Sequence, residues 1–169
     1  MATTTAAYIS VEQYLKTVYR PDCDYVDGVV EERNVGEVDH GIVQTRLAYF
    51  FMRVLAQTGL VPITEVRMRV RENKYRIPDL VLTRGRPTER VLTTPPVLCI
   101  EILSSEDRIA RINTRIQDYF EFGVPVVWLV DPEERRLWIY RPGVPFEEAI
   151  GSVKLDGTSI EVPFSEIFD

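Results

Sequence analysis

The sequence predicts an α/β fold with a mixed central β-sheet flanked by helices, preceded by an N-terminal helix and hairpin. Two near-continuous apolar runs, residues 77–82 and 97–103, are typical of central strands that are covered on both faces. A helical pattern over residues 104–123 then leads into a third apolar run at 124–130. This succession indicates parallel strands joined by a crossover helix. Because the 169 residues are 45% hydrophobic, they suffice for one core, and we expect a single domain over residues 1–169.

The N-terminal part carries a helix signal and a hairpin signal. Ser10 is a good N-cap, and Gln13 lies three residues further on, as in a capping box. The Asp27-Gly28 pair lies between apolar strand formers, which is the strongest short-range signal for a tight hairpin. A short helix and two antiparallel strands are therefore expected here.

The remaining elements follow from hydrophobic periodicity. A second helix is predicted from Asp39 to Gly59, because apolar residues recur there at helical spacing. Alternation over residues 65–71 predicts a strand with one wet, basic face. Residues 137–140 are expected to close the sheet as a hairpin strand, and the tail should hold another strand pair and a short turn at 164–168. The apolar positions of the second helix are Ile42, Val43, Leu47, Phe50, Phe51, Val54 and Leu55.

The protein is acidic, with a net charge of −6, which argues at first against a nucleic-acid partner because phosphate repels an acidic surface. The charge is unevenly distributed, however. Residues 67–115 contain eleven Arg and Lys against six Asp and Glu, so this segment carries +5 and the rest of the chain −11. Such asymmetry fits either a solvated mixed-charge surface or a basic binding face.

The sequence gives no sign of a membrane or secretory segment. Charged residues or prolines interrupt every apolar run before it reaches the roughly 20 residues that span a bilayer. The N-terminus lacks a basic start followed by a long apolar run. Two isolated cysteines, Cys23 and Cys99, do not form a disulfide framework. We therefore expect a cytoplasmic protein.

Two carboxylates interrupt the apolar central strands. Strand alternation places Asp79 on the face of Ile77 and Val81, and it places Glu101 on the face of other apolar residues. A buried ionised carboxylate must be paired, protonated or bound to a cation. One shared cation is the simplest partner for both, and oxygen ligands favour Mg²⁺ or Mn²⁺. The alternative is a buried salt bridge with an arginine such as Arg76.

Four segments of the chain resemble one known family. Residues 25–28 (Tyr-Val-Asp-Gly), 76–81 (Arg-Ile-Pro-Asp-Leu-Val), 96–104 (Pro-Val-Leu-Cys-Ile-Glu-Ile-Leu-Ser) and 123–132 follow its pattern in the same order. The Pro-Asp pair followed by an acid in the next strand resembles the PD-(D/E)XK nuclease superfamily, and the closer match is to the Uma-type restriction endonucleases. The resemblance covers nearly the whole chain and implies a restriction-endonuclease-like core.

The resemblance also implies a reaction, the metal-dependent hydrolysis of DNA phosphodiester bonds. Asp79, Glu101 and the backbone carbonyl of Ile102 would hold the metal. The family lysine is missing two residues after the second acid, where this chain has Leu103. Its displaced position on the following helix, four residues before a tyrosine, is Arg115. Arginine can clamp a phosphate but cannot act as a general base, so catalysis would use metal hydroxide alone, be weakened or be lost.

Other side chains are candidates for accessory roles. His40 could hydrogen-bond a metal-bound water or a phosphate, or it could be a solvated helix-end residue. Glu65 could be a third carboxylate or could face solvent, and Gln117 lies near Arg115. The candidate DNA-binding residues are Arg67, Arg69, Arg71, Arg76, Arg108 and Arg111.

Three readings of the function therefore stand side by side. The first is a Mg²⁺-dependent DNA endonuclease. The second is a DNA-binding module that kept the nuclease fold and lost turnover. The third is a structural or interaction domain in which Asp79 and Glu101 are salt-bridge partners. We also expect a homodimer, formed by pairing of an exposed edge strand at residues 137–140.

Overall fold

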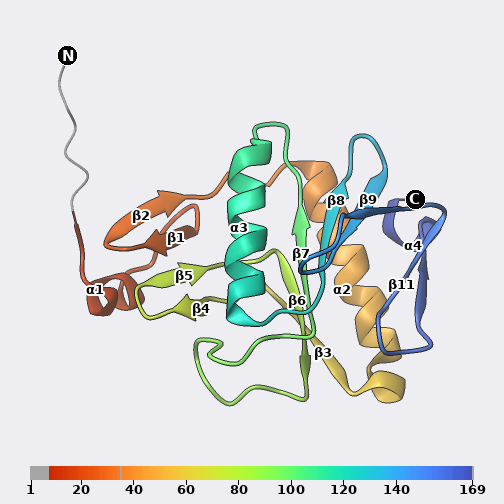
Figure 1. Ribbon diagram of the computed structural model, residues 1–169, viewed down its shortest axis with the longest axis horizontal. Coiled ribbons are helices and arrows are strands. Elements are labelled where there is room, and N and C mark those ends of the chain that lie inside the picture. Colours follow the sequence, from red (N-terminus) through yellow and green to blue (C-terminus); the bar gives the residue numbers. More distant parts are fainter. Residues whose placement is uncertain (1–7, 35, 169) are drawn as a thin grey trace.

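The computed structural model describes residues 8–34 and 36–168. A six-stranded mixed sheet forms its centre, with α2 (Val38–Thr58) on one face and α3 (Ile109–Phe122) on the other (Figure 1). No helix within the described ranges is both long enough and apolar enough to cross a membrane. In spatial order the sheet contains β10 (Glu147–Ala149), β9 (Arg136–Tyr140), β8 (Val127–Asp131), β7 (Leu98–Ile102), β6 (Leu80–Arg84) and β3 (Leu60–Thr64).

The central strands are buried on both faces, as their apolar sequences predict. All five residues of β7 are buried, and so are four of the five in β6 and in β8. β7 and β8 pair in parallel through the α3 crossover, whereas the other pairs of this sheet are antiparallel. The apolar run that forms β8 was predicted to start at residue 124, but the strand starts at Val127. Residues 123 and 124 cap the end of α3 instead, because the N–H groups of Gly123 and Val124 both donate to the carbonyl of Tyr119.

A smaller, four-stranded sheet lies beside the main one. Its order is β2 (Val29–Glu32), β1 (Cys23–Val26), β5 (Lys74–Arg76) and β4 (Met68–Arg71), and α1 (Val11–Lys16) packs against it (Figure 1). The N-cap prediction is confirmed, since the Ser10 hydroxyl accepts from the Gln13 N–H at 3.1 Å. The hairpin prediction is confirmed too, with Asp27 and Gly28 at φ of 47° and 94° between the paired strands.

Helix α2 packs against one face of the main sheet. It ends at Gly59, which adopts φ 65° and donates its N–H to the Leu55 carbonyl at 2.8 Å. Its buried face joins a core cluster with residues of β6, β7 and β8. One prediction for this helix is wrong: Ile42 lies outside the core, and 48% of its surface is exposed.

The strand predicted over residues 65–71 is shorter than expected and belongs to the smaller sheet. Met68 and Val70 are buried, so the predicted alternation is correct within β4. Glu65 is not part of that strand, because it adopts φ 50° in the turn after β3. Strand β3, which pairs with β6, was not predicted from the sequence.

Two further predictions need correction. Helix α3 starts at Ile109 rather than near Ser104, because the Asp107 carboxylate accepts from the N–H of Ser104 at 2.8 Å and closes a turn there. Strand β9 is not an edge strand, because β10 pairs with it. The predicted pairing of two chains through residues 137–140 therefore has no free edge to use.

The C-terminal tail packs against the main sheet on the same side as α2. Strands β11 (Ser152–Lys154) and β12 (Glu161–Pro163) form the predicted pair, and α4 (Ser165–Phe168) is the predicted terminal turn. Val153, Val162 and Ile167 join the core cluster on the α2 side of the sheet.

Candidate active site

Two carboxylates converge where β6 begins and β7 ends. The antiparallel register pairs Leu80 with Ile100, which brings Asp79 beside Glu101 and Ile102. Asp79 and Glu101 are each 2% exposed, and both line one cavity of about 20 Å³ together with Ile102. The Asp79 Oδ2 atom accepts from the Ile102 N–H at 2.7 Å. The sequence therefore predicted the convergence correctly.

Asp79 lies just before β6, not inside it as alternation had suggested. Its backbone carbonyl accepts from the Glu65 N–H at 3.2 Å and from Gln44 Nε2 at 2.9 Å. Gln44 comes from α2, so the helix and the turn after β3 together fix the backbone at this point. This fixed backbone directs the carboxylate toward the end of β7.

Two nitrogen side chains, those of Arg33 and His40, reach the Asp79 carboxylate. Arg33, just after β2, donates from Nη2 to Oδ1, and His40 Nε2 lies 3.4 Å from Oδ2. Burial alone would raise the pKa of Asp79, but the hydrogen bond to His40 and the charge of Arg33 outweigh it and lower the pKa. Burial likewise disfavours the charged form of His40, yet the bond to Asp79 and its charge raise the pKa of His40.

Glu101 has a different pair of partners. The Tyr119 hydroxyl donates to Oε1, and Arg115 Nη2 lies 3.3 Å from Oε2 while donating to the Ile77 carbonyl at 2.9 Å. Burial raises the pKa of Glu101 to about 7, with the Asp79 charge adding to the rise and Arg115 opposing it. Tyr119 is buried, as the helical pattern suggested, but its hydroxyl belongs to the site.

A second buried network lies next to the carboxylate pair. Arg76 contacts Asp24 at 2.9 Å, Asp118 at 2.7 Å and Glu31 at 3.0 Å, and Lys74 lies 2.7 Å from Asp118. The expectation that Arg76 binds DNA is wrong, because its side chain is 4% exposed and surrounded by these acids. It is not the salt-bridge partner of either site carboxylate, a position that Arg33 and Arg115 hold instead.

The other candidate arginines differ in their exposure and in their hydrogen bonds within the protein. Arg67 is held by α1, since it donates to the carbonyls of Leu15 and Thr17 at 3.2 and 2.9 Å. Arg71 is half exposed and pairs with Asp27 at 2.6 Å. Arg69, Arg108 and Arg111 are exposed as well, and Arg111 donates to the Glu32 carbonyl at 2.9 Å.

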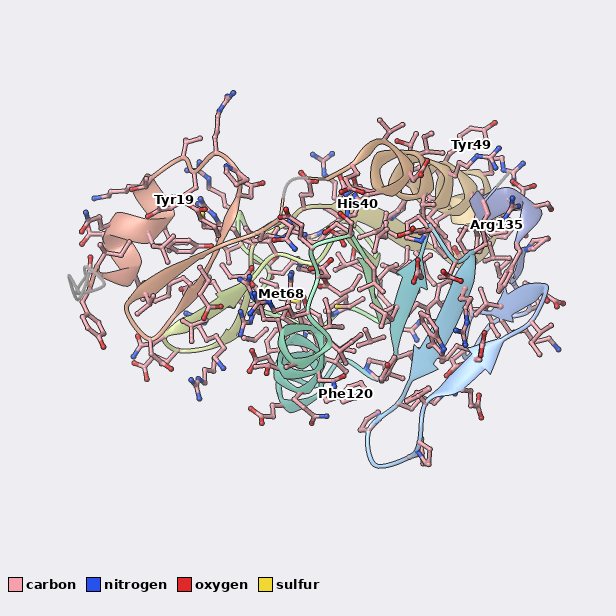
Figure 2. All side chains as sticks on the ribbon, turned by 90° about the horizontal axis from the view of Figure 1, so that it is seen from above. Tyr19, His40, Tyr49, Met68, Phe120 and Arg135 are labelled. Atoms are coloured by element: carbon pink, nitrogen blue, oxygen red, sulfur yellow. The ribbon has the colours of Figure 1, made fainter. Side chains whose placement is uncertain are left out.

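Of the accessory candidates, the structure brings His40 to the site (Figure 2) and leaves two outside it. Gln117 is exposed on α3 and does not line the cavity. The Glu65 side chain is exposed and accepts from Gln44 Nε2 at 3.3 Å. Within the described ranges, no group of three or more His, Cys, Asp or Glu side chains is placed to hold a metal ion.

Sequence reasoning missed several residues that line the cavity. Arg33 and Asn34 come from the chain after β2, and Ser104 and Asp107 come from the turn after β7. Asn34 Nδ2 donates to Asp107 Oδ1 at 2.9 Å, which ties the two segments together. No periodicity or motif marks these residues, because the contact joins positions more than seventy residues apart.

The donor set fits one divalent cation. Each of the four carboxylate oxygens of Asp79 and Glu101 has a nitrogen or hydroxyl partner, and Asp79 Oδ2 has two, the Ile102 N–H and His40. A carboxylate oxygen has two lone pairs, so the other three oxygens can each accept once more. The cavity has room for about one water-sized group. Two carboxylates and the Ile102 carbonyl are the hard oxygen ligands that Mg²⁺ prefers. The pairing of each acid with its own arginine agrees equally well with two structural salt bridges.

Comparisons with known proteins bear on both the family and the fold. A family model described as "Uma2: Putative restriction endonuclease" matches residues 11–163. No curated protein matches the chain. A crystal structure from Anabaena variabilis ATCC 29413, described as a putative nuclease belonging to DUF820, is 20% identical with a TM-score of 0.81. The match covers 95% of this chain and 97% of that one. At this identity the likeness shows a shared fold, and it confirms the predicted fold class.

Proposed function

Since the chain belongs to the Uma2 family of restriction endonucleases, we propose that it is a Mg²⁺- or Mn²⁺-dependent endonuclease that hydrolyses DNA phosphodiester bonds in the cytoplasm. One observation carries the proposal. Two buried carboxylates on neighbouring strands, Asp79 and Glu101, line the same small cavity. The family membership supports the nuclease class, and the donor chemistry of the cavity supports the choice of metal.

Each residue of the site has a role in this proposal. Asp79, Glu101 and the Ile102 carbonyl would hold the metal, which supplies an acidified water and neutralises charge on the phosphate when bound. Arg115 and Arg33 line the cavity and would hold the scissile phosphate by charge-assisted hydrogen bonds. His40 orients the Asp79 carboxylate through the 3.4 Å contact. Neither arginine can take a proton from water.

Exposed arginines would hold the rest of the DNA backbone. Arg108 precedes α3, next to the turn that lines the cavity, and Arg111 lines an adjoining pocket of about 280 Å³. Arg69 and Arg71 lie on the exposed face of β4. Contacts of this kind fix the position of the duplex and carry no sequence information. Binding should therefore weaken steeply as salt rises.

Plasmid nicking tests the proposal. Purified protein with Mg²⁺ or Mn²⁺ should convert supercoiled plasmid to the open-circular form. Asp79→Asn and Glu101→Gln should each abolish this conversion, because each removes a metal ligand while keeping the side-chain shape. Glu121→Gln, an exposed position on α3, is the matched control and should nick like the unaltered protein. Undiminished nicking by either site variant would remove that residue from the mechanism.

A second candidate function is a DNA-binding module without turnover. The observation that favours it is Arg115, which occupies the displaced lysine position and lies 3.3 Å from Glu101. An Arg115→Lys variant separates the two. If this change creates or strongly raises nicking, the natural protein is a weakened or inactive nuclease. If the variant binds DNA at low salt but does not nick it, the binding module is favoured. If the unaltered protein does not bind DNA at low salt, that result counts against both.

The third reading keeps the two acids as structural salt-bridge partners. The pairs Arg33 with Asp79 and Arg115 with Glu101 are the contacts that favour it. Calorimetric titration distinguishes it, because a protein with purely structural pairs should show no binding heat with Mg²⁺ or Mn²⁺. The homodimer also remains part of the proposal, although β9 cannot form it.

A further inference from the structure

Helix α2 carries an apolar stripe on its solvent side. The stripe consists of five apolar residues and one threonine, all of them exposed: Val38, Ile42, Thr45, Tyr49, Met52 and Ala56. Its four large members are exposed by 78% (Val38), 48% (Ile42), 62% (Tyr49) and 53% (Met52). Figure 2 shows Tyr49 on the outer side of α2, away from the sheet.

The stripe lies opposite the face that packs on the core. The core-facing residues of α2 are Val43, Leu47, Phe50 and Phe51. At about 100° per residue, the stripe is centred roughly half a turn away from them. A helix with apolar residues on both faces is normally buried on both. One face of α2 is covered by its own core, so the other lacks a covering layer within the described part of the chain.

The spacing of the stripe is that of a helix-pairing seam. Its members follow one another at intervals of four, three, four, three and four residues, which is the a/d pattern of a coiled coil. From Val38 to Ala56 the seam runs about 27 Å along the helix. Scattered exposed apolar residues need no partner, but a continuous seam of this length marks an association surface.

Charge along one flank of the seam favours a second copy in antiparallel orientation. Asp39 lies beside the first turn, and Arg53 lies on the same flank fourteen residues later. An antiparallel partner brings Asp39 of one copy near Arg53 of the other, and it also opposes the helix dipoles. Arg53 pairs with Glu166 at 2.8 Å but stays 42% exposed, so its guanidinium can also donate to a second carboxylate. In such a dimer the two Arg46 side chains would lie near each other at the two-fold axis and would repel. The apolar seam must therefore supply most of the attraction.

We infer that two copies of this chain associate through the outer face of α2, packed antiparallel along the Val38–Ala56 seam. The inference does not depend on nuclease activity. A helix surface about 27 Å long and about 10 Å wide is well below the roughly 800 Å² per partner of a standard interface. The dimer should therefore be weak and concentration-dependent, with a dissociation constant on the order of tens of micromolar.

Sedimentation velocity tests the association. The unaltered protein should shift from monomer to dimer between about 5 and about 500 µM, a range that brackets a micromolar constant. Tyr49→Glu should remain monomeric throughout, because it places a charge at the middle of the seam. The control is Ile150→Glu, at a site that is 90% exposed but lies outside α2, and it should dimerise normally. Circular dichroism checks that both variants are folded.

Disulfide trapping tests the orientation. An antiparallel seam places residue 42 of one copy opposite residue 52 of the other. Mixed Ile42→Cys and Met52→Cys proteins should cross-link to each other, while Ile42→Cys alone should not cross-link to itself. The native Cys23 and Cys99 are buried and free, so they should not compete. A monomer at every concentration, a Tyr49→Glu protein that still dimerises, or self-linking Ile42→Cys would overturn the inference.

Discussion

Replacing Arg76 by Met should destabilise the protein strongly. The side chain of Arg76 is 4% exposed and touches three acids, with Asp24 and Asp118 themselves buried. Methionine keeps the apolar stem and removes the guanidinium. Asp24 and Asp118 would then be left in a low-dielectric setting without their main counter-charge, which is the situation that makes breaking a buried pair costly.

The structure sets the size of this effect. Removing one partner of a buried pair costs about 3–5 kcal/mol of unfolding free energy. Two contacts survive the change, because Lys74 Nζ stays 2.7 Å from Asp118 and the Ile77 N–H still donates to Asp24 at 3.0 Å. We therefore expect the lower end, about 3 kcal/mol. For a protein of this size that corresponds to a melting temperature lower by about 6–12 °C.

Urea unfolding followed by circular dichroism measures the loss. Arg69→Met is the matched control, because Arg69 lies on the exposed face of the neighbouring strand β4, and it should change stability by less than about 0.5 kcal/mol. If Arg76→Met loses no more than the control, the acids around it do not need the guanidinium. The account of this network would then be wrong.

Four further substitutions test the site and the fold by urea or thermal unfolding. Tyr119→Phe should cost about 1–3 kcal/mol, because it removes a buried hydrogen bond and leaves Glu101 Oε1 without that donor; a neutral effect would mean that Glu101 finds another donor. Gly59→Ala should cost about 1 kcal/mol at its φ of 65°, whereas Gly41→Ala, inside α2 with open space around it, should gain about 0.5–1 kcal/mol; equal signs would contradict the backbone argument. Leu82→Ala should cost about 2–5 kcal/mol, since Leu82 is fully buried in the core, and a smaller loss would imply that the site collapses around the gap.

Much of the fold could be predicted because it is set by local signals. The Asp27-Gly28 turn, the ends of α2 and α3 at Gly59 and Gly123, and the doubly buried central strands all depend on residues close in sequence. Prediction failed where a distant or polar contact decides the outcome. Helix α3 starts late because Asp107 binds back to Ser104, and β9 is not an edge because β10 folds against it.

The candidate site, like the fold, could be predicted only where local signals decide it. The convergence of Asp79 and Glu101 follows from two acids placed in neighbouring strands, so the sequence was enough to predict it. The partner of each acid was not predictable, because Arg33 meets Asp79 across 46 positions of the chain. Arg76 looked equally suitable in the sequence, yet it pairs with Asp118, 42 positions away. Which guanidinium meets which carboxylate is decided by the packing of β1, β5 and α3, not by spacing.

The central claim is that Asp79 and Glu101 together hold a divalent cation. A crystal of the protein soaked with Mn²⁺ and measured at the manganese absorption edge tests it most directly. The account predicts one anomalous peak at about 2.2 Å from an oxygen of each carboxylate and near the Ile102 carbonyl. An absence of any peak, with Arg33 and Arg115 still paired to the two acids at saturating Mn²⁺, would contradict it and leave the structural salt-bridge reading in its place.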